Sequence, residues 1–220
     1  MWMRLRRFLD EPFFNKLHHF SSFYYKAKGA LVYRYFFESF GTGSYIRRPL
    51  LIFNPAFISI GKNVGIRDGV RLEVVRSNKS RQPRIVIGDN TNIEQNVHIV
   101  CHNYVKIGSN VSITGNCSIV DVTHPFEDVS DPVKIGARIL DEHSFVEIGD
   151  GTFVGFGSVI LPNVRIGRCA VIGANSVVMK DVPDYTVVAG APASIIKQFD
   201  AGNQAWVRFS KEREPEVWPQ

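Results

Sequence analysis

The sequence contains no long apolar run. No stretch of its 220 residues reaches the roughly 20 consecutive apolar residues that a membrane-spanning helix needs. Its basic start, MWMRLRRFLDEPFF, has no apolar segment of signal-peptide length, because Asp10 and Glu11 interrupt it. These absences argue against a spanning helix or a cleaved leader, and they predict a cytoplasmic protein.

Cysteine and unbalanced charge are also scarce. The three cysteines, Cys101, Cys117 and Cys169, are widely spaced and form no C-x-x-C pair. We therefore expect small buried thiols in a reducing compartment, not disulfides or a zinc cage. The net charge of +5 is too weak to indicate a nucleic-acid partner, although it suits an anionic small molecule or a membrane surface. With 45% hydrophobic residues, the composition predicts a globular chain with one sizeable core.

The sequence is rich in a repeat of six residues. Five segments share one form: Ile-Gly, then a polar residue, then usually Asn or Gly, and then a small or β-branched residue. They are IGKNVG at 60, IGDNTN at 87, IGSNVS at 107, IGDGTF at 148 and IGRCAV at 166. Each is followed by two further hexads led by an aliphatic residue. Five groups of three hexads predict a parallel β-helix, a triangular prism to which each hexad gives one short strand. Strands of a β-sandwich would not keep this phase.

The prism model assigns a role to each position of the hexad. The first and fifth residues point inward, and the fifth must be small; in the leading hexads it is Val64, Thr91, Val111, Thr152 and Ala170. The chain turns at the fourth residue, where Asn and Gly best tolerate a positive φ. These turn residues are Asn63, Asn90, Asn110 and Gly151.

Insertions into the repeat all follow a third hexad. The distances from Leu72 to Ile87, Ile99 to Ile107, Ile119 to Ile148 and Ile160 to Ile166 are 15, 8, 29 and 6 residues, which leaves insertions of 9, 2, 23 and 0 after one hexad is subtracted. All insertions should therefore leave the prism at one edge, as binding loops of repeat proteins commonly do. His124 stands where the longest one departs, and Pro125 prevents the strand from continuing.

The repeat divides the chain into three parts. Residues 1–57 are expected to form a helical segment and a partial first coil, residues 58–197 the β-helix with an insertion at 124–147, and residues 198–220 a polar tail. Apolar residues at 13, 17, 20, 24 and 31 fall near helical spacing among lysines. Packing of this amphipathic segment on the prism and peripheral attachment to a membrane both remain open.

Several motifs resemble those of a known family. The hexads, the DVTHP corner, FVGFGSVILPNVRIG, GANSVVMKDVPDYTVVAGAPASIIK and the upstream SFGTGSYIRRPLLIFNPAFISIG are similar to those of hexapeptide-repeat acyltransferases, over residues 38–198. The nearest resemblance is to polysaccharide O-acetyltransferases and to the maltose, galactoside and nodulation acetyltransferases. It implies a left-handed β-helix, a homotrimer, and acetyl-coenzyme A bound between neighbouring prisms. With the basic, aromatic N-terminus, peripheral attachment at the inner membrane joins the cytoplasm as an expected location.

The resemblance implies a general base and its neighbours. Acetyl transfer to a hydroxyl needs a base, and a neutral imidazole, whose ordinary pKa is about 6.5, suits that role. His124 occupies the position of the family's base. Asp121, three residues earlier, is expected to orient the imidazole or to hold an acceptor hydroxyl. His102, in the preceding coil, and His143, inside the long insertion, are expected to contact the acceptor.

The same resemblance implies a coenzyme site. Its backbone N–H donor for the developing oxyanion falls at Gly155 and Phe156, and Phe153 stands where relatives often carry Trp as a wall for the pantetheine arm. The remaining expected coenzyme contacts are close backbone approach at Gly173 and Ala174, and phosphate contacts from Lys180 and Lys197.

Three other functions remain open at this point. A streptogramin-type xenobiotic O-acetyltransferase would share the fold and the base, and a non-catalytic β-helix scaffold would need neither His124 nor its loop. A zinc carbonic anhydrase would need a second histidine shortly after the first, and Glu127, Asp128 and Val129 stand there instead. The sequence favours a metal-independent O-acetyltransferase that transfers acetyl from acetyl-coenzyme A to a sugar or oligosaccharide in surface polysaccharide biosynthesis.

Overall fold

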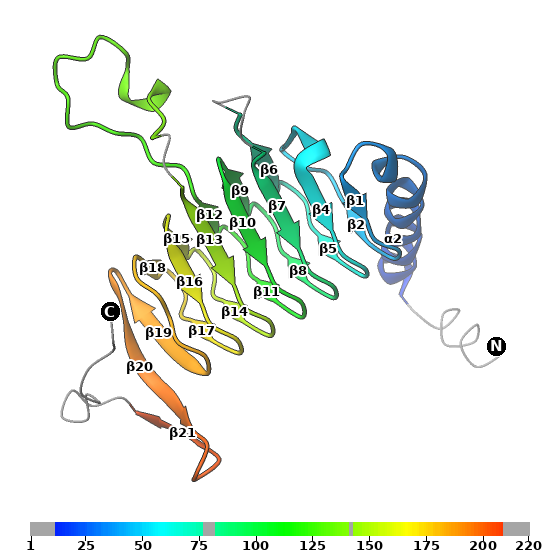
Figure 1. Cartoon of the computed structure of the whole chain (residues 1–220). Helices are drawn as coiled ribbons and strands as arrows, with labels where there is room; N and C mark the ends of the chain where they lie inside the picture. Colours follow the sequence, from blue (N-terminus) through cyan, green and yellow to red (C-terminus); the bar gives the residue numbers. More distant parts are fainter. Residues whose placement is uncertain (1–11, 77–81, 141–142, 209–220) are drawn as a thin grey trace.

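The fold is a left-handed parallel β-helix, as the repeat and the resemblance predict. A computed structural model describes residues 12–76, 82–140 and 143–208. Three sheets, here called A, B and C, run the length of the prism, and every coil contributes one strand to each of them (Figure 1). Sheet A has the strand order β1-β4-β7-β10-β13-β16, and sheet C the order β3-β6-β9-β12-β15-β18. Sheet B runs β2-β5-β8-β11-β14-β17-β19-β20-β21.

The strands are short, because each spans one face of the prism. Sheet A contains β1 (Ser39–Phe40), β4 (Ile58–Ile60), β7 (Arg84–Ile87), β10 (Tyr104–Ile107), β13 (Phe145–Ile148) and β16 (Val164–Ile166). Sheet B contains β2 (Tyr45–Ile46), β5 (Gly65–Ile66), β8 (Asn92–Ile93), β11 (Ser112–Ile113), β14 (Phe153–Val154), β17 (Val171–Ile172), β19 (Thr186–Gly190), β20 (Ala193–Asp200) and β21 (Ala205–Arg208). Sheet C contains β3 (Leu51–Phe53), β6 (Arg71–Val74), β9 (His98–Cys101), β12 (Ser118–Val120), β15 (Val159–Ile160) and β18 (Val177–Val178).

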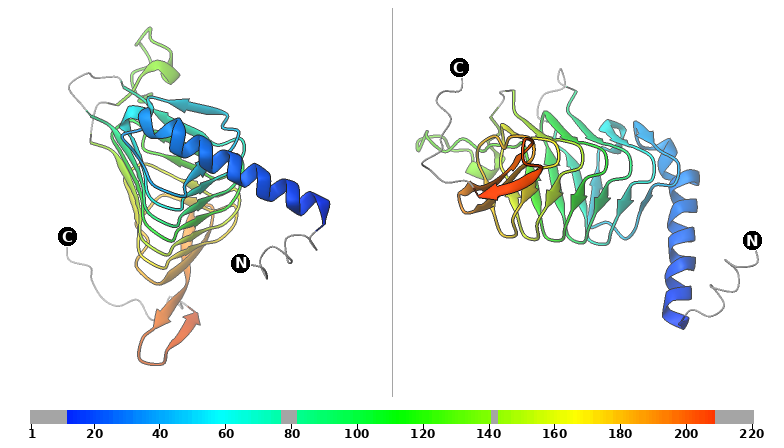
Figure 2. Two further views of the ribbon diagram at one scale, coloured as in Figure 1. Left: turned by 90° about the vertical axis from the view of Figure 1, so that its right-hand side faces the viewer. Right: turned by 90° about the horizontal axis from the view of Figure 1, so that it is seen from below.

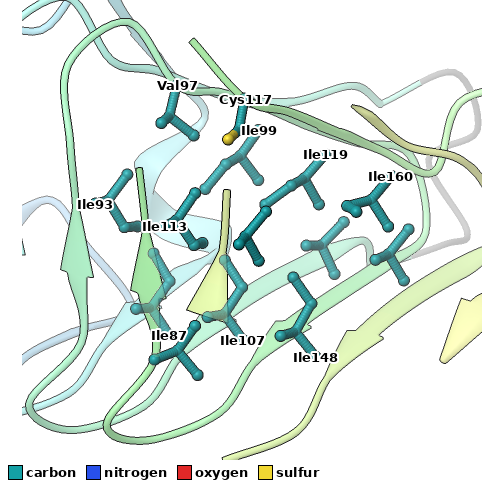
Figure 3. Close-up of a cluster of buried hydrophobic side chains, with 14 of the residues drawn as sticks. Ile87, Ile93, Val97, Ile99, Ile107, Ile113, Cys117, Ile119, Ile148 and Ile160 are labelled. Carbon is teal, nitrogen blue, oxygen red and sulfur yellow. The ribbon is translucent and has the colours of Figure 1, made fainter. Parts of the chain in front are cut away.

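Ladders of identical aliphatic residues form the core. Ile60 pairs with Ile87, Ile87 with Ile107, Ile107 with Ile148, and Ile148 with Ile166, so one inward position repeats through five coils. Figure 3 shows such isoleucines of neighbouring coils filling the interior. The predicted small fifth residues are buried as well; they are Val64, Thr91, Val111, Thr152 and Ala170. Because burial of apolar surface contributes about 25 cal/mol per Å², this continuous core holds the short strands together.

The turn residues take the predicted backbone conformation. Asn63, Asn90 and Asn110 have φ of 55°, 57° and 57°, and Gly151 has φ of 70°. Cys169, with φ of 51°, fills the position in the next coil, and Tyr185, with φ of 53°, fills it in the turn that follows. Side chains other than Asn are unusual in this left-handed region, so both residues depart from the Asn or Gly of the earlier coils.

The insertions leave the prism at one edge, as predicted. The segments between β6 and β7, β9 and β10, and β12 and β13 all pass from sheet C to sheet A. We call this the C–A edge, and the opposite edge of sheet C, where sheet B passes to it, the B–C edge. Figure 1 shows the longest insertion projecting from the C–A edge after β12. The described residues of this insertion contain one short 3₁₀ helix, η3 (Ile135–Ala137).

Both ends of the prism differ from the sequence-based expectation. The first coil is complete rather than partial, because β1, β2 and β3 each join one of the three sheets. It follows a helix, α2 (Phe13–Leu31), and a 3₁₀ turn, η1 (Tyr33–Tyr35), while a second turn, η2 (Pro55–Phe57), precedes β4. Residues 1–11 of the expected helical segment lie outside the described residues.

The expected polar tail begins inside a strand. β20 runs antiparallel to β19 and continues to Asp200, and β21 pairs antiparallel with β20. Phe199 and Trp206 stack edge to face within this hairpin, with ring centroids 5.6 Å apart. The hairpin therefore extends sheet B beyond the last coil, and the rest of the predicted tail, residues 209–220, lies outside the described residues.

Candidate active site

His124 lies on the C–A edge, exposed, four residues after β12 ends. Its Nδ1 atom is 2.7 Å from the backbone carbonyl oxygen of Arg138, on the returning arm of the insertion. The Leu140 N–H also donates to the Thr123 carbonyl at 3.0 Å, so the two arms run side by side here. The ring is thus held by the backbone of the loop that it faces.

This contact fixes the tautomer of the imidazole. A carbonyl oxygen only accepts hydrogen bonds, so Nδ1 must carry the proton that it donates to Arg138. In the neutral ring, Nε2 then has a free lone pair and is the atom able to accept a proton. The arrangement gives His124 the geometry of a general base without a carboxylate partner.

Arg138 also organises the loop that holds this ring. Its guanidinium donates to the backbone carbonyls of Val133, Asp128 and Asp131 at 2.6, 2.8 and 2.7 Å, and it pairs with the Asp131 carboxylate at 3.2 Å. The side chain is largely buried in the insertion. One residue therefore closes the loop through its side chain and orients His124 through its carbonyl. Sequence reasoning missed Arg138, because every residue has a backbone carbonyl and the residue type therefore does not mark this contact.

Asp121 does not orient His124, which corrects the predicted role. Its side chain is fully buried at 0% exposure. The carboxylate accepts the backbone N–H groups of Asn103 and Tyr104 at 2.8 and 2.7 Å, and that of His102. Asp121 therefore caps the turn between β9 and β10 in the preceding coil. The remaining part of the prediction, contact with an acceptor hydroxyl, has no support from this buried position.

The other two predicted acceptor contacts separate in the same way. His102 is only 2% exposed, so its ring is part of the corner and is not offered to an acceptor. His143 is exposed and lies two residues before β13 begins. Of the two histidines, His143 alone keeps the surface position that an acceptor contact needs.

The predicted coenzyme residues gather mainly at the B–C edge. Phe156 and Ala174 occupy equivalent turn positions in adjacent coils, and the Asn175 N–H donates to the Phe156 carbonyl at 2.7 Å. Within the described part of the chain, neither the Phe156 nor the Ala174 backbone N–H has an acceptor. Two amide donors that belong to exposed residues thus stand one coil apart, with Phe153 on the outer face of β14 beside them.

The two glycines at this edge have a structural reason of their own. The Gly155 and Gly173 N–H groups donate to the carbonyls of Ile172 and Val188, both at 2.8 Å. A Cβ on Gly155 would lie 2.6 Å from the Ala174 nitrogen, and one on Gly173 would lie 2.8 Å from the Ala189 Cβ. Close coil stacking therefore accounts for both glycines. The Gly155 N–H is committed to the ladder, so only the Phe156 N–H of the predicted pair remains available to an oxyanion.

The two predicted lysines lie elsewhere. Lys180 follows β18 at the C–A edge and lines a groove of about 1430 Å³ along the C-terminal coils. Lys106, Arg165 and Arg168 line the same groove, although Arg168 pairs with Asp184 at 2.8 Å. These three cations lie within or next to the hexads that begin at Ile107 and Ile166, and no motif in the sequence marked them as groove residues. Lys197 is exposed on β20, opposite Val187, away from the amide pair in the prism turns.

No cysteine stands beside His124. Burial raises the pKa of the Cys101 and Cys117 thiols, which disfavours their thiolates. Cys169 is exposed, but it lies at the turn between sheets A and B. Within residues 12–76, 82–140 and 143–208, no three His, Cys, Asp or Glu side chains converge as a metal site requires.

His124 and the two amide donors stand at different edges of one chain. His124 marks the C–A edge of sheet C, whereas Phe156 and Ala174 mark its B–C edge. The width of a sheet separates them, so a single prism does not bring these groups together.

The sequence matches the model of the family described as "Bacterial transferase hexapeptide (six repeats)" over residues 145–180. It is 34% identical over 166 residues to a protein of Escherichia coli (strain K12) that is provisionally named lipopolysaccharide biosynthesis O-acetyl transferase WbbJ. That similarity covers 73% of this chain and 82% of the relative. The galactoside O-acetyltransferase of the same organism is 32% identical over 145 residues, covering 66% of this chain and 65% of the enzyme.

Solved structures share the fold. A hexapeptide-repeat acetyltransferase from Vibrio cholerae superposes with a TM-score of 0.56 at 24% identity, covering 80% of this chain and 81% of that one. AntD, an N-acyltransferase from Bacillus cereus solved with dTDP and 3-hydroxybutyryl-CoA, has a TM-score of 0.62 at 23% identity, with coverages of 75% and 85%. At these identities the similarity concerns the architecture alone.

Proposed function

Since this chain belongs to the hexapeptide-repeat acyltransferase family, we propose that it is an acetyl-coenzyme A-dependent O-acetyltransferase that acts on a sugar hydroxyl in surface polysaccharide biosynthesis. The observation that carries the proposal is the His124 imidazole, held by the Arg138 carbonyl so that its Nε2 lone pair is free. The names of the two O-acetyltransferase relatives support a hydroxyl acceptor, and that of the lipopolysaccharide protein supports the pathway class.

The reaction is a direct transfer. Nε2 of His124 takes the proton of the acceptor hydroxyl as its oxygen attacks the thioester carbonyl carbon. The C–O bond forms, and the tetrahedral intermediate then collapses with cleavage of the C–S bond. The imidazolium returns the proton to the leaving sulfur, which gives the acetyl ester and free coenzyme A. The buried thiols of Cys101 and Cys117 support a route without an acyl-enzyme.

The donor is proposed to lie along the B–C edge. The N–H groups of the exposed residues Phe156 and Ala174 suit the amide carbonyls of a pantetheine arm, and Phe153 offers a flat apolar wall. The Phe156 N–H is also the candidate donor to the oxyanion. Lys180 at the C–A edge of a neighbouring prism, with Lys106 in the same groove, would attract the coenzyme phosphates, whereas the position of Lys197 on the hairpin supports that role less well.

The proposed site is completed by a second copy of the chain. Because His124 and the amide donors mark opposite edges of sheet C, the C–A edge of one prism must meet the B–C edge of a neighbour. Such a contact joins two different surfaces, so it closes only by rotation into a ring. The homotrimer that the family resemblance implies is such a ring, with three equivalent sites. In this proposed assembly the two edges that carry the proposed chemistry meet at each contact between subunits.

Substitution of the base tests the proposal. We expect His124→Ala to lower kcat at least about a hundredfold, the usual contribution of a general base, while the circular dichroism spectrum and the oligomer remain unchanged. Thiol release from acetyl-coenzyme A with a panel of sugar and antibiotic hydroxyls measures the rate and distinguishes the acceptor classes. His98→Ala is the matched control, because His98 begins β9 and belongs to no part of the site. Unchanged turnover in His124→Ala would remove this mechanism.

A further inference from the structure

The ring of Phe156 lies over the turn of the preceding coil at the B–C edge. Four successive coils place Gln95, Gly115, Phe156 and Ala174 at one position of the turn from sheet B to sheet C, and backbone hydrogen bonds of 2.7–3.0 Å join each turn to the next. A Cβ on Gly115 would lie 3.3 Å from Cε2 and 3.5 Å from Cδ2 of the Phe156 ring. The ring therefore fills the space that the missing side chain of Gly115 leaves.

This direction of the side chain makes the two sides of the Phe156 amide unequal. Toward the N-terminal coils the ring covers Gly115, and the exposed Gln95 follows. Toward the C-terminal coils stands Ala174, whose side chain is a single methyl group. Phe156 as a whole remains 52% exposed, so its ring offers an apolar surface to a ligand. A ligand that lies along this edge therefore has room beside Ala174 and meets an aromatic wall at Phe156.

The proposed donor would end at this wall. In the proposed function the pantetheine arm bonds the Ala174 N–H, and the oxygen of the thioester carbonyl bonds the Phe156 N–H. The arm thus approaches Phe156 from the side of Ala174, which places the sulfur on that side of the thioester carbon. The acyl chain is attached to the other side of the same carbon, so it points toward the Phe156 ring and Gly115.

The wall also lies at the level of the proposed base. Gly115 and His124 belong to the same coil, which contributes β10, β11 and β12. Figure 2 shows the coils one behind another when the prism is seen from its N-terminal end, so its edges run along the stacking direction. If two such edges meet along their length in the proposed ring, each coil faces the equivalent coil of its neighbour. His124 of the partner subunit then faces the turn that the Phe156 ring covers.

We propose that the Phe156 ring determines the acyl specificity of the enzyme and limits the donor to an acetyl group. A methyl group fits between the thioester carbon and the ring, whereas a longer chain must displace the ring from its place over Gly115. One methylene group in an apolar pocket changes selectivity by about 10- to 200-fold, so a single side chain is enough for this choice. The inference rests on the proposed function, from which it takes the position of the donor.

Titration calorimetry of the full chain with acetyl- and butyryl-coenzyme A tests this limit without any acceptor. We expect the wild type to bind acetyl-coenzyme A at least about tenfold more tightly than butyryl-coenzyme A. Phe156→Ala should bring the two affinities within about threefold of each other by improving the binding of butyryl-coenzyme A, and Phe156→Leu should lie between. Phe36→Ala is the matched control and should keep the wild-type ratio, since Phe36 is an exposed phenylalanine at the N-terminal end of the prism.

The outcomes separate this limit from the proposed function. Equal affinities of the wild type for the two donors would overturn the limit, and so would folded Phe156 variants that keep the wild-type ratio; circular dichroism checks the fold. A wild type that binds neither donor would remove acetyl-coenzyme A from the proposed function, and the limit with it. The titrations are made without detergent, which would take up butyryl-coenzyme A. None of the described helices is long and apolar enough to cross a bilayer.

Discussion

The Nδ1 atom of His124 and the backbone carbonyl oxygen of Arg138 lie 2.7 Å apart, although fourteen residues separate them in the sequence. The orientation of the imidazole therefore depends on the conformation of the insertion between them. That conformation depends in turn on the Arg138 side chain, which bonds three carbonyl groups of the same loop. A residue that touches no reacting atom is thus expected to set the reactivity of one that does.

Arg138→Ala should lower kcat by about tenfold to a hundredfold, because even a small displacement of the His124 ring from the acceptor hydroxyl slows proton transfer. The KM for acetyl-coenzyme A and the melting temperature should change little, since the side chain supports an exposed loop outside the core. Arg138→Lys should recover only part of the rate, because an ammonium cannot reproduce the planar fork. Arg67→Ala, which removes an ion pair with Glu94 just after strands β5 and β8, is the control. Equal kcat in wild type and Arg138→Ala would contradict the positioning role.

Asp121→Asn should act through stability. The carboxylate satisfies the backbone N–H groups of residues 102–104, and an amide would turn its NH₂ group toward one of these donors. An unsatisfied buried group costs about 1–3 kcal/mol, so the unfolding midpoint should fall and activity should fall with it. Glu127→Gln, at an exposed site in the insertion, should change neither. A stable Asp121→Asn protein with strongly reduced kcat would instead restore the catalytic role predicted from the sequence.

The prism was predictable because its determinants are local and repeated. Each inward Ile and each left-handed Asn carries its meaning within one hexad, and stacking in register multiplies that signal across the coils. The single edge for insertions followed from counting residues alone. The hairpin of β20 and β21 has no hexad phase, so the sequence identified it only as a tail.

The site was harder to predict because proximity in sequence does not give side-chain direction. Asp121 lies two residues after the inward Ile119, and in a strand that alternation already points it into the core. Its nearness to His124 outweighed this signal. Gly29 of α2 likewise packs against Ser44 and Phe40 of the first coil, and the helical periodicity does not say which side of the helix makes that contact.

Cys169→Asn should stabilise the protein. Cys169 holds the left-handed turn, with φ of 51°, that Asn63, Asn90 and Asn110 occupy in earlier coils. Because Asn tolerates this region better than other side chains, the gain should reach about 1 kcal/mol, or about 2–4 °C in Tm. Thermal unfolding followed by circular dichroism measures it. Cys169→Ser is the control and should show no gain, since serine lacks this tolerance; equal melting of the two variants would exclude turn strain at this position.

Asp184 should make stability depend on pH in the acid range. Its carboxylate accepts the Arg168 backbone N–H at 2.7 Å and pairs with the guanidinium at 2.8 Å, and these two contacts lower the pKa of Asp184. A folded pKa below the ordinary value of about 3.9 means that the stabilisation is complete above that value and is lost as the pH falls through the folded pKa. Asp184→Asn should therefore melt below the wild type at neutral pH, and the difference should vanish in strong acid. Calorimetry across this range measures it, with Glu94→Gln as the control; a difference that persists in acid would show that packing, and not the charge, supports this corner.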